Sequence, residues 1–507
     1  MVRCQGILRL SRMVPVPVAV ITLCSMCLAS WTGEVPVCPA DSTVQLTSRY
    51  SHWCLAADAS GAVHVAWEDW RDGPDGIYYS SRVLGDGWAP ESFRVSMGDE
   101  DYVGNPAICC DSEGNVFVAW REKRFPSPAS QIYYRMYSTG AGWDSTDAML
   151  DSDPPERESY AVSAAMDDSG NVHVVRVRDI SPPWNRLLYK RYTPGEGWGA
   201  NKAISVGVNG TSRHPVILEH GTHLHVVWSQ YTVAEGTCIY YRKYSPSAGW
   251  DSTAMKVSTD ETNTDPSLAI DAEGDLHVIW VVWFSDENRE IAYRKRTADG
   301  DWDPIVSYVS EIDSVSSECP TISCDGTGNV HVVWQDWGST TVLFERVLDK
   351  DAGWGDTASL AGGAWSAEQP HLVSDICGDL HLVWTDSRSC QPRLYYTRYD
   401  DGMSSVASRE DAEIPALNGF ASPNPCSGHT VIHYSIHAVG MPADVIVRIC
   451  DVRGTLVSDF AHEKVPHSGV VTWDGRNRLG VPVAAGVYFF IAETPSQKDV
   501  TKIIVVK

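Results

Sequence analysis

The stretch GNVHVVWQDW, residues Gly328–Trp337, decides the fold because the chain repeats it. Close variants begin at four other glycines: GAVHVAWEDW at Gly61, GNVFVAWREK at Gly114, GDLHVIWVVW at Gly274 and GDLHLVWTDS at Gly378. The residue that closes the apolar part of each phrase recurs every 50 to 56 residues, at Trp67, Trp120, Arg176, Trp228, Trp280, Trp334 and Trp384. A period of this length predicts a repeat architecture with seven units.

Each repeat contains four short strand-like runs, as the fifth repeat shows. These runs are PSLAI, LHVIW, IAYRKR and VSYVS, at residues 266–270, 276–280, 291–296 and 306–310. A D-x-x-G turn separates the first two runs, and a Gly-Trp or Asp-Trp pair follows the third. Asp can bond the turn backbone and Gly tolerates positive φ, so this spacing predicts a tight hairpin. Seven four-stranded units with no long amphipathic helix predict an all-β, seven-bladed β-propeller.

The ends of the ring carry a signal for closure. The seventh repeat lacks a Gly-Trp pair after its third strand. Residues 41–48, DSTVQLTS, resemble DSTAMKVS at 251–258 in the fourth repeat. We therefore expect residues 41–48 to supply the outer strand of the last blade, which would cover an exposed edge. The alternative is that MSSVAS, residues 403–408, forms that strand.

The first 33 residues are predicted to be a signal peptide. Arg3, Arg9 and Arg12 precede an apolar run over residues 14–29, which is short for a spanning helix, and Ala29 and Ser30 offer a cleavage site. Beyond residue 33 no segment is apolar enough to span a membrane, so the exported protein is expected to be secreted or held at the cell surface.

Composition excludes some partners. From residue 34 onward, 37 basic side chains stand against 65 acidic ones, a formal charge of about −28. Nucleic acids and anionic membranes need a basic face, so neither is expected as a partner. Eleven cysteines remain after residue 33, and Cys426 with Cys450 is the expected disulfide in an exported chain. No C-x-x-C pair, phosphate loop or dinucleotide fingerprint occurs there, so neither a metal nor a cofactor is expected.

The propeller is expected to span residues 34–405, followed by a linker at 406–420 and a second domain at 421–507. The last segment reads as successive antiparallel strands of a β-sandwich. SPNP at 422–425, VRICDVRGTLV at 447–457 and TWDGRNRLGVPVAAGVYFF at 472–490 carry a family resemblance. They resemble the immunoglobulin-like C-terminal domain related to that of the flagellar hook-capping protein, and the C-terminal sorting domain of type IX secretion substrates. That resemblance implies export, with secretion machinery as a partner and attachment at the cell surface; the alternative is a spacer.

The repeats resemble those of the sialidase-like superfamily. PSLAI, GDLHVIW and IYYRKYSPSAGW follow the family's strand order, with a degenerate Asp-box in which Ser245 and Trp250 remain. The resemblance implies three arginines that grip a carboxylate, an acid, and a Tyr/Glu nucleophile pair. Two departures weigh against that activity. SHWCL at 51–55 places no arginine where the family has its first one, and sialidases have six blades.

One face of the ring is expected to collect the loops that enter the inner strands and the loops between second and third strands. The first set of loops contributes Arg49, Tyr50, Tyr102, Asn105, Arg157, Glu158, Arg213, His214, Asn263, Asp265, Glu318 and Gln369. If the protein is an enzyme, we expect Arg49, Arg157 and Arg213 to bind an acidic sugar, because a guanidinium matches carboxylate geometry. Asp69 or Asp72 would then be the acid. The alternative is that the arginines are solvated or paired, and that the repeated W-x-D carboxylates hold loops.

Aromatic side chains on this face are candidates for ligand contacts. Trp70, Trp283 and Trp337 lie at or near matching repeat positions, and Arg71 shares a loop with Trp70. They could stack on sugar rings, or they could pack across the blade tops. The repeated histidines, such as His277 and His331, fall on separate blades and are expected to pack between blades.

Three functions are compatible with this sequence. The leading hypothesis is an exported, non-catalytic propeller that binds a glycan or another cell-surface partner. The second is a glycoside hydrolase or polysaccharide lyase that acts on acidic sugars. The third is a structural surface or adhesion protein.

Overall fold

The computed structural model describes two compact units, Met1–Ser404 and Ser405–Lys507, each considered by itself below. In the first unit the described residues are 30–37, 45–46, 54–71, 75–83, 87–89, 91–98, 102–125, 127–150, 157–181, 184–207, 210–259, 261–285, 288–388 and 392–400. In the second they are 420–422, 430–435, 446–451, 456–459, 468–478, 481–493 and 498–505. These residues contain strands and no helix, and therefore no helix that could cross a membrane.

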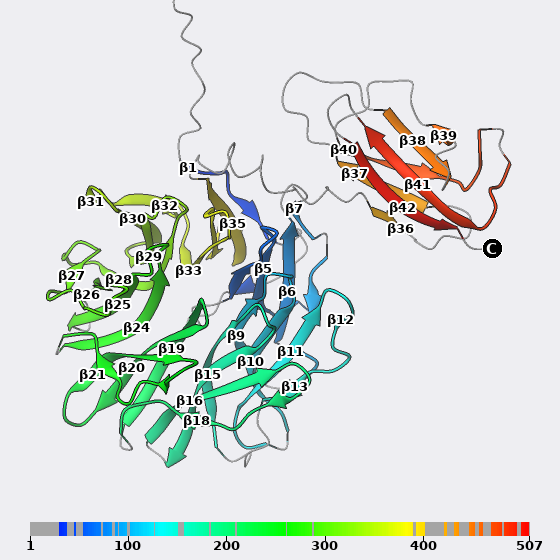
Figure 1. Ribbon diagram of the computed structural model, residues 1–507. Coiled ribbons are helices and arrows are strands. Elements are labelled where there is room, and N and C mark those ends of the chain that lie inside the picture. Colours follow the sequence, from blue (N-terminus) through cyan, green and yellow to red (C-terminus); the bar gives the residue numbers. More distant parts are fainter. Residues whose placement is uncertain are drawn as a thin grey trace, which may run out of the picture. The chain divides into compact units, whose positions relative to one another are not determined.

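The first unit is a seven-bladed β-propeller, as the repeats predict (Figure 1). Blade 1 contains β3 (Gln45–Leu46), β4 (Leu55–Ala57), β5 (Val63–Asp69), β6 (Gly76–Val83), β7 (Gly87–Trp88) and β8 (Phe93–Arg94). Blade 2 contains β9 (Tyr102–Cys110), β10 (Val116–Lys123), β11 (Gln131–Ser138), β12 (Gly142–Trp143) and β13 (Ala148–Met149). Blade 3 contains β14 (Ser159–Met166), β15 (Val172–Ser181), β16 (Trp184–Thr193), β17 (Gly197–Trp198) and β18 (Lys202–Ala203). Blade 4 contains β19 (Gly210–His220), β20 (His223–Thr232), β21 (Gly236–Ser245), β22 (Gly249–Trp250) and β23 (Met255–Lys256).

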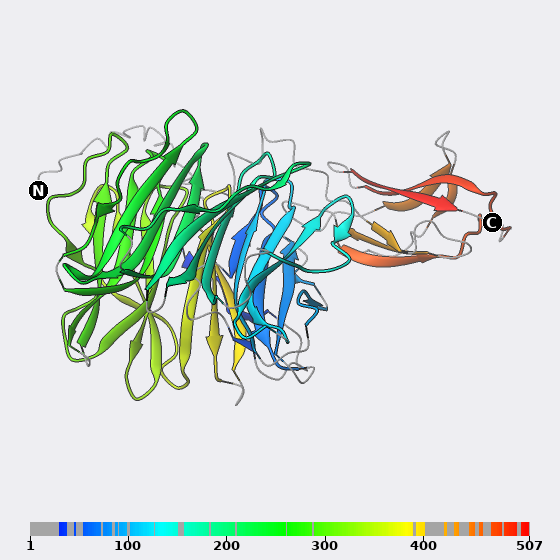
Figure 2. The same ribbon diagram turned by 90° about the horizontal axis from the view of Figure 1, so that it is seen from below.

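The remaining blades follow the same order. Blade 5 contains β24 (Thr262–Ile270), β25 (Leu276–Ser285), β26 (Asn288–Arg296) and β27 (Ser307–Tyr308). Blade 6 contains β28 (Ser316–Cys324), β29 (Val330–Trp337), β30 (Thr341–Asp349), β31 (Gly353–Trp354) and β32 (Ala358–Ala361). Blade 7 contains β33 (Ala367–Ser374), β34 (Leu380–Asp386) and β35 (Arg393–Asp400), with β1 (Ser30–Trp31) and β2 (Val35–Pro36) at its rim. Figure 2 shows the same strands from below.

Ring closure differs from the expectation. β1 and β2 pair with β35 and complete blade 7, whereas β3, within the segment 41–48, pairs with β5 of blade 1. The prediction that residues 41–48 close the last blade is therefore wrong. The physical reason is burial: Trp31 packs against the core between blades 6 and 7, and Val37 is 1% exposed between blades 7 and 1. The first described strand of the ring thus begins at Ser30, inside the segment predicted to be the signal peptide, and the alternative strand 403–408 lies outside the described residues.

In blades 1, 5, 6 and 7 the aspartate of the turn is hydrogen-bonded to the repeated histidine. In blade 5 the carboxylate of Asp271 accepts the backbone N–H of Asp275 at 2.8 Å, while Gly274 has a φ of 85°. The same carboxylate meets Nε2 of His277 at 3.0 Å, and Nδ1 of His277 lies 2.8 Å from the hydroxyl of Tyr293. His277 is 3% exposed, so it packs between strands. Burial lowers the pKa of His173 and His225, in the same position of blades 3 and 4, to about 4 and about 3.

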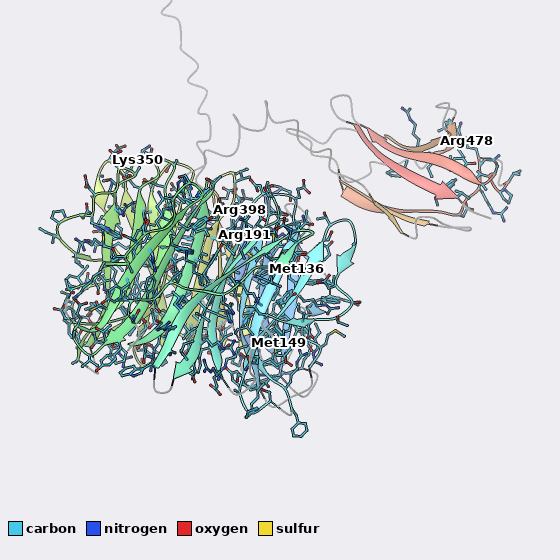
Figure 3. All side chains as sticks on the ribbon, turned by 60° about the horizontal axis from the view of Figure 1, so that its bottom comes forward. Met136, Met149, Arg191, Lys350, Arg398 and Arg478 are labelled. Atoms are coloured by element: carbon cyan, nitrogen blue, oxygen red, sulfur yellow. The ribbon has the colours of Figure 1, made fainter. Side chains whose placement is uncertain are left out.

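The tryptophan that ends each phrase is buried and its indole N–H is satisfied. Nε1 of Trp334 donates to Asp336 at 2.8 Å, and Nε1 of Trp120 donates to Glu122 at 2.6 Å. In five of the six blades with this tryptophan the acceptor stands two residues later, and in blade 5 it is Oδ1 of Asn263. These bonds stabilise the fold, because a buried N–H without a partner is destabilising. Edge-to-face aromatic contacts also add to the packing, such as that of Tyr293 in β26 with Trp354. Arg398 of β35, labelled in Figure 3, forms an ion pair with Asp379.

The second unit contains two antiparallel sheets. One is β36 (Phe420–Ser422), β37 (Thr430–Ser435) and β40 (Ser468–Trp473); the other is β39 (Leu456–Asp459), β38 (Ile446–Asp451), β41 (Gly486–Glu493) and β42 (Lys498–Val505). Trp473 is 1% exposed and lies edge-on to Tyr488 at 5.4 Å. The immunoglobulin-like assignment stays a prediction. Cys426 and the linker residues up to 419 lie outside the described residues, so the expected disulfide and linker stay predictions too.

Candidate functional site

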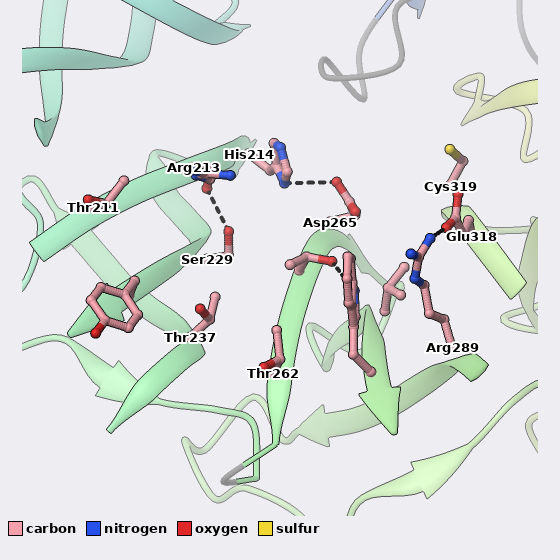
Figure 4. Close-up of a pocket in the computed structure, with 14 residues that line it drawn as sticks. Thr211, Arg213, His214, Ser229, Thr237, Thr262, Asp265, Arg289, Glu318 and Cys319 are labelled. Atoms are coloured by element: carbon pink, nitrogen blue, oxygen red, sulfur yellow. Dashed lines mark hydrogen bonds and ion pairs between the residues drawn. The ribbon is translucent and has the colours of Figure 1, made fainter. Parts of the chain in front are cut away.

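A pocket of about 510 Å³ lies among blades 4, 5 and 6 (Figure 4). Its residues come from the first halves of the inner strands β19, β24 and β28 and from the ends of β20 and β25 with the starts of β21 and β26. In an antiparallel blade these segments reach the same side of the ring. The pocket therefore collects side chains from strands that are far apart in the sequence.

Three residues of the pocket have an unusual backbone. His214, Asp265 and Cys319 have φ values of 46°, 48° and 50°, and each precedes a proline. The residue before proline normally takes an extended conformation, and residues other than glycine rarely have positive φ. The pairing of each inner strand shifts register at this point, for example between Arg213 and Val216. Asn105 and Gln369 have the same feature in blades 2 and 7. Strain of this kind concentrates at functional sites.

Two of the strained residues meet across a blade boundary. Nδ1 of His214 lies 2.8 Å from Oδ1 of Asp265. A carboxylate at one ring nitrogen fixes the orientation of an imidazole. The pair can therefore serve as a hydrogen-bonding group for a ligand or as an oriented base.

The wall of the pocket contains a fixed indole. The guanidinium of Arg289 lies 3.9 Å from the ring centroid of Trp283, whose Nε1 donates to Oγ1 of Thr264 at 3.0 Å. Arg289 forms an ion pair with Glu318, which is buried. Nε1 of Trp337 donates to the other oxygen of Glu318 at 2.9 Å. These contacts join Trp283 and Trp337 into one rigid chain of side chains.

The remaining lining is polar. Six residues contribute hydroxyl groups to the pocket: Thr211, Ser229, Tyr231, Thr237, Thr262 and Thr264. Arg213 is exposed at its edge, and its backbone carbonyl accepts the hydroxyl of Ser229 at 3.2 Å. Within the described part of the chain no ion pair involves the Arg213 side chain. The positive charges of Arg213 and Arg289 equal in number the negative charges of Asp265 and Glu318. Of the two arginines, Arg213 is the one exposed to solvent.

The structure brings together some of the residues predicted for a site. Arg213 and Trp283 line the pocket, and Trp337 lies next to it through Glu318. Arg157 is exposed and does not line this pocket; its carbonyl accepts Nε2 of Gln131. Arg49 and Asp72 lie outside the described residues.

The predicted residues of blade 1 lie elsewhere. Asp69 is 0% exposed and accepts Nε1 of Trp67 at 3.1 Å together with the guanidinium of Arg71 at 2.5 Å. Arg71 also donates to Ser92 and lies 4.4 Å from the ring centroid of Tyr78. Asp69 and Arg71 thus hold the loop after β5, while Trp70 is 41% exposed.

Four pocket residues had no predicted role. His214, Asp265 and Glu318 were expected on this face of the ring and lie in the inner strands β19, β24 and β28. Arg289, at the start of β26, was not predicted. The signal that could have found His214 and Asp265 is the X-Pro dipeptide at the same place in blades 4, 5 and 6, and Glu318 directly precedes the third such dipeptide. Arg289 has no such signal, because its role depends on a contact with the next blade.

Comparisons with known proteins show the fold. No protein-family model matches the sequence, and no curated protein matches it. Among solved structures, the chain is similar to an ulvan lyase of a new polysaccharide lyase family bound to -[GlcA(1-4)Rha3S]-. The TM-score is 0.50 at 11% identity, covering 72% of this chain and 95% of that chain. It is also similar to the polysaccharide lyase Uly1, with a TM-score of 0.50 and 11% identity over 73% of this chain and 99% of that chain.

A sialidase also occurs among the structural neighbours. The NanB sialidase from Streptococcus pneumoniae has a TM-score of 0.40 and 12% identity, covering 72% of this chain and 70% of that chain. The propeller therefore has polysaccharide lyases and sialidases as structural neighbours. At these identities the likeness concerns the fold.

Proposed function

We propose that the propeller binds a glycan in the pocket among blades 4, 5 and 6, with a sugar ring stacked on Trp283. The observation that carries this proposal is the fixed indole in a pocket lined by six hydroxyl-bearing residues. An aromatic face supplies apolar contact to the C–H groups of a sugar, and surrounding hydroxyls and carboxylates match its hydroxyl groups. Structural neighbours include a lyase bound to a saccharide, which supports this class of ligand.

Rigidity of the wall favours binding. Arg289 on the ring and Thr264 at Nε1 hold Trp283 before any ligand arrives. A side chain that is already ordered loses little conformational entropy when the ligand binds, so more of the contact energy appears as affinity. Exposed Arg213 adds a contact for a carboxylate or sulfate group on the glycan.

A binding experiment with the full chain tests this proposal. Neutral and acidic oligosaccharides would be titrated by calorimetry into the wild-type protein, Trp283→Ala, and Trp365→Ala as a matched control. Trp365 is 52% exposed and does not line the pocket. We expect Trp283→Ala to weaken binding at least tenfold and Trp365→Ala to change it less than twofold. Equal effects of the two substitutions would place the ligand elsewhere.

Replacement of Arg213 tests whether this side chain binds an acidic group of the ligand. We expect Arg213→Ala to weaken binding of an acidic oligosaccharide about tenfold and to leave a neutral one unchanged. The same loss for both ligands would mean that Arg213 supports the pocket rather than a ligand charge.

A second candidate function is catalysis on acidic polysaccharide, which the His214–Asp265 pair favours. An imidazole oriented by a carboxylate is suited to proton transfer, and both residues have positive φ. In a lyase reaction the imidazole would take the proton next to a uronate carboxylate as the glycosidic C–O bond breaks, and the leaving oxygen would gain a proton from solvent. Release of unsaturated oligosaccharides, read by mass spectrometry and absent in His214→Ala, would establish this activity. Retention of glycan without product favours the binding protein.

Export and attachment belong to the same proposal. We propose that the N-terminal segment directs export, with cleavage before Ser30 so that β1 remains, and that the immunoglobulin-like unit from about residue 421 engages secretion machinery. N-terminal sequencing of the exported protein tests the first part. Deletion of residues 405–507, followed by surface labelling, tests the second. A protein that binds no glycan and releases no product, yet stays on the surface, would fit the structural role instead.

A further inference from the structure

A second group of side chains lies at the boundary of blades 1 and 2. It comprises Glu68 near the end of β5, Trp70 just after β5, and Tyr102, Gly104 and Asn105 at the start of β9. These positions correspond to those that form the pocket in blades 4 to 6, so the group lies on the same side of the ring. None of its members lines that pocket.

The carboxyl group of Glu68 lies at the centre of this group. Nε1 of Trp70 donates to its Oε1 at 3.4 Å. A Cβ atom added to Gly104 would lie 2.7 Å from Oε2 of Glu68 and 3.5 Å from the hydroxyl of Tyr102. The carboxyl and the phenol therefore meet over the Cα of Gly104, and any other residue at position 104 would push them apart. Tyr102 is held by Nδ2 of Asn105, which donates to its hydroxyl at 3.1 Å.

Both aromatic rings are open to solvent. Trp70 is 41% exposed and Tyr102 is 37% exposed. The ring of Tyr102 already accepts one cation, because the guanidinium of Arg121 lies 4.9 Å from its centroid. Aromatic faces attract ammonium and guanidinium groups, and tryptophan does so most strongly.

The charges around Glu68 are mostly negative. Asp75 lies before β6 and raises the pKa of Glu68, while the nearby cations Arg71 and Arg121 are paired with Asp69 and Glu158. Within the described residues Glu68 forms no ion pair, and its carboxyl accepts a hydrogen bond from the indole of Trp70. Burial, followed by repulsion from Asp75, raises the pKa of Glu68 to about 7. Among the described residues, therefore, no unpaired cation balances the ionised carboxylate of Glu68.

We propose that Glu68, Trp70 and Tyr102 form a binding site for a primary ammonium group, carried by an amino sugar. The carboxylate supplies the counter-ion, and the indole N–H of Trp70 and the hydroxyl of Tyr102 lie beside it. The net charge of −25 attracts cations to the whole chain. The ammonium chemistry follows from this site alone. Its assignment to a sugar, rather than to a lysine side chain, rests on the proposed glycan pocket of the same face.

Proton linkage follows from this geometry. A cation binds the ionised form of Glu68, so below about pH 7 binding must release a proton. The affinity for a cation of constant charge, such as methylammonium, is expected to fall as the pH drops from 8 to 6. Replacement of Glu68 by glutamine removes both the attraction and this pH dependence.

The test uses the full chain and two matched sugars. A deacetylated glucosamine oligomer and its N-acetylated counterpart have the same ring, but only the first carries ammonium groups. Both would be titrated by calorimetry into wild type, Glu68→Gln and Glu113→Gln. Glu113 is an exposed carboxylate in a D-x-x-G turn, on the other side of the ring, and serves as the charge control.

We expect wild type and Glu113→Gln to bind the deacetylated oligomer at least tenfold more tightly than the N-acetylated one. We expect Glu68→Gln to lose this preference, and Trp70→Ala to weaken binding of the deacetylated oligomer. Equal binding of the two oligomers, no binding of the deacetylated one, or an unchanged preference in Glu68→Gln would each overturn the proposal. Thermal unfolding of Glu68→Gln shows whether the variant is folded.

Two further arms separate this proposal from the glycan pocket. A trilysine peptide that binds through Glu68, when the deacetylated sugar does not, would assign the site to a protein amine and overturn the amino sugar. If Trp283→Ala leaves all glycan binding intact while Glu68→Gln does not, the pocket proposal fails and the ammonium site stands.

Discussion

Nε1 of Trp31 donates a hydrogen bond of 2.8 Å to Oε2 of Glu345, a residue 314 positions later in the chain. Oε1 of the same carboxylate lies 2.7 Å from Nδ1 of His331, whose Nε2 lies 3.2 Å from Asp325. In blades 1, 3, 4, 5 and 7 a tyrosine hydroxyl meets the corresponding histidine, as Tyr293 does in blade 5. Blade 6 has a carboxylate instead, and that carboxylate holds the strand that closes the ring.

The first prediction concerns this closing contact. Trp31→Phe removes one hydrogen bond and leaves an oxygen of Glu345 without its donor, so we expect a loss of about 1–2 kcal/mol in the free energy of unfolding. Trp31→Ala also removes the ring that lies edge-on to Tyr399 at 5.4 Å, and we expect about 3 kcal/mol or more. Urea unfolding measures both. Exposed Trp365 is the control, and a Trp31→Ala value no larger than that of Trp365→Ala would show that closure does not depend on this indole.

The second prediction is a loss of stability at high pH. Burial lowers the pKa of His331, but the hydrogen bonds that its ring donates to the carboxylates of Asp325 and Glu345 outweigh burial and raise the pKa, so its contribution is complete below pH 6.5 and is lost as the pH rises through the raised value. Glu345→Gln keeps an acceptor for Trp31 but removes the charge, so it is expected to reduce this alkaline loss. Melting temperatures between pH 6 and pH 9 provide the measurement. Parallel curves for the two proteins would contradict the role of Glu345.

A further prediction is a loss of stability at low pH, which depends on Asp325, the partner of His331. Hydrogen bonds from His331 and Thr327 overcome the effect of burial and lower the pKa of Asp325 to about 2. Its contribution is present above pH 3.8 and is lost as the pH falls toward 2. We expect Asp325→Asn to be less stable than wild type at pH 6 and to approach it near pH 2, as judged by unfolding at both values. A difference that stays constant with pH would be a packing effect.

The third prediction concerns Glu290, a carboxyl with no exposed surface between blades 5 and 6. Burial raises its pKa to about 7, although Ser310 donates to it at 2.7 Å. A carboxyl with a raised pKa favours the folded state below pH 4.5, and this contribution is lost as the pH rises to 7. Glu290→Gln is expected to be more stable than wild type at pH 8, by up to about 3 kcal/mol. A variant that is destabilised equally at pH 5 and pH 8 would contradict this.

The fourth prediction tests the wall of the glycan pocket. Arg289→Met removes the cation over Trp283 and leaves buried Glu318 unpaired, whereas Glu318→Gln keeps the shape and the acceptor for Trp337. We expect Arg289→Met to weaken glycan binding about tenfold and Glu318→Gln to weaken it less. Calorimetric titration with the tightest ligand of the wild type measures both. The reverse order would mean that the charge of Glu318, not the position of Trp283, controls binding.

Much of the fold could be predicted because the repeat is local. The D-x-x-G turn joins Asp271 to Gly274 over four residues, and Trp280 follows at a constant distance in the chain. Closure could not be predicted in the same way. The sequence of DSTVQLTS is similar to that of an outer strand, but its strand β3 pairs with β5 of blade 1. β1 and β2 complete blade 7 instead, because Trp31 and Val37 pack into the hydrophobic clusters on the two sides of that blade.

In the candidate site, too, some residues could be predicted from the repeat and others depend on contacts between blades. Arg213 and Trp283 stand at loop positions that the repeat already marks, and both line the pocket. His214, Asp265 and Arg289 acquire their roles from contacts with the next blade, which depend on how the blades pack. Glu68 is similar, since its partner residues Tyr102 and Gly104 belong to blade 2.

The sequence by itself determined that this protein is a ring of seven antiparallel sheets, because hydrogen-bonded turns and, in six repeats, buried tryptophans recur at a similar spacing along the chain. Only the tertiary structure decided which segment closes the ring and which side chains share a site. Those relationships join residues as distant as Trp31 and Glu345, and their energies come from burial and charge pairing between blades, which no local pattern of residues records.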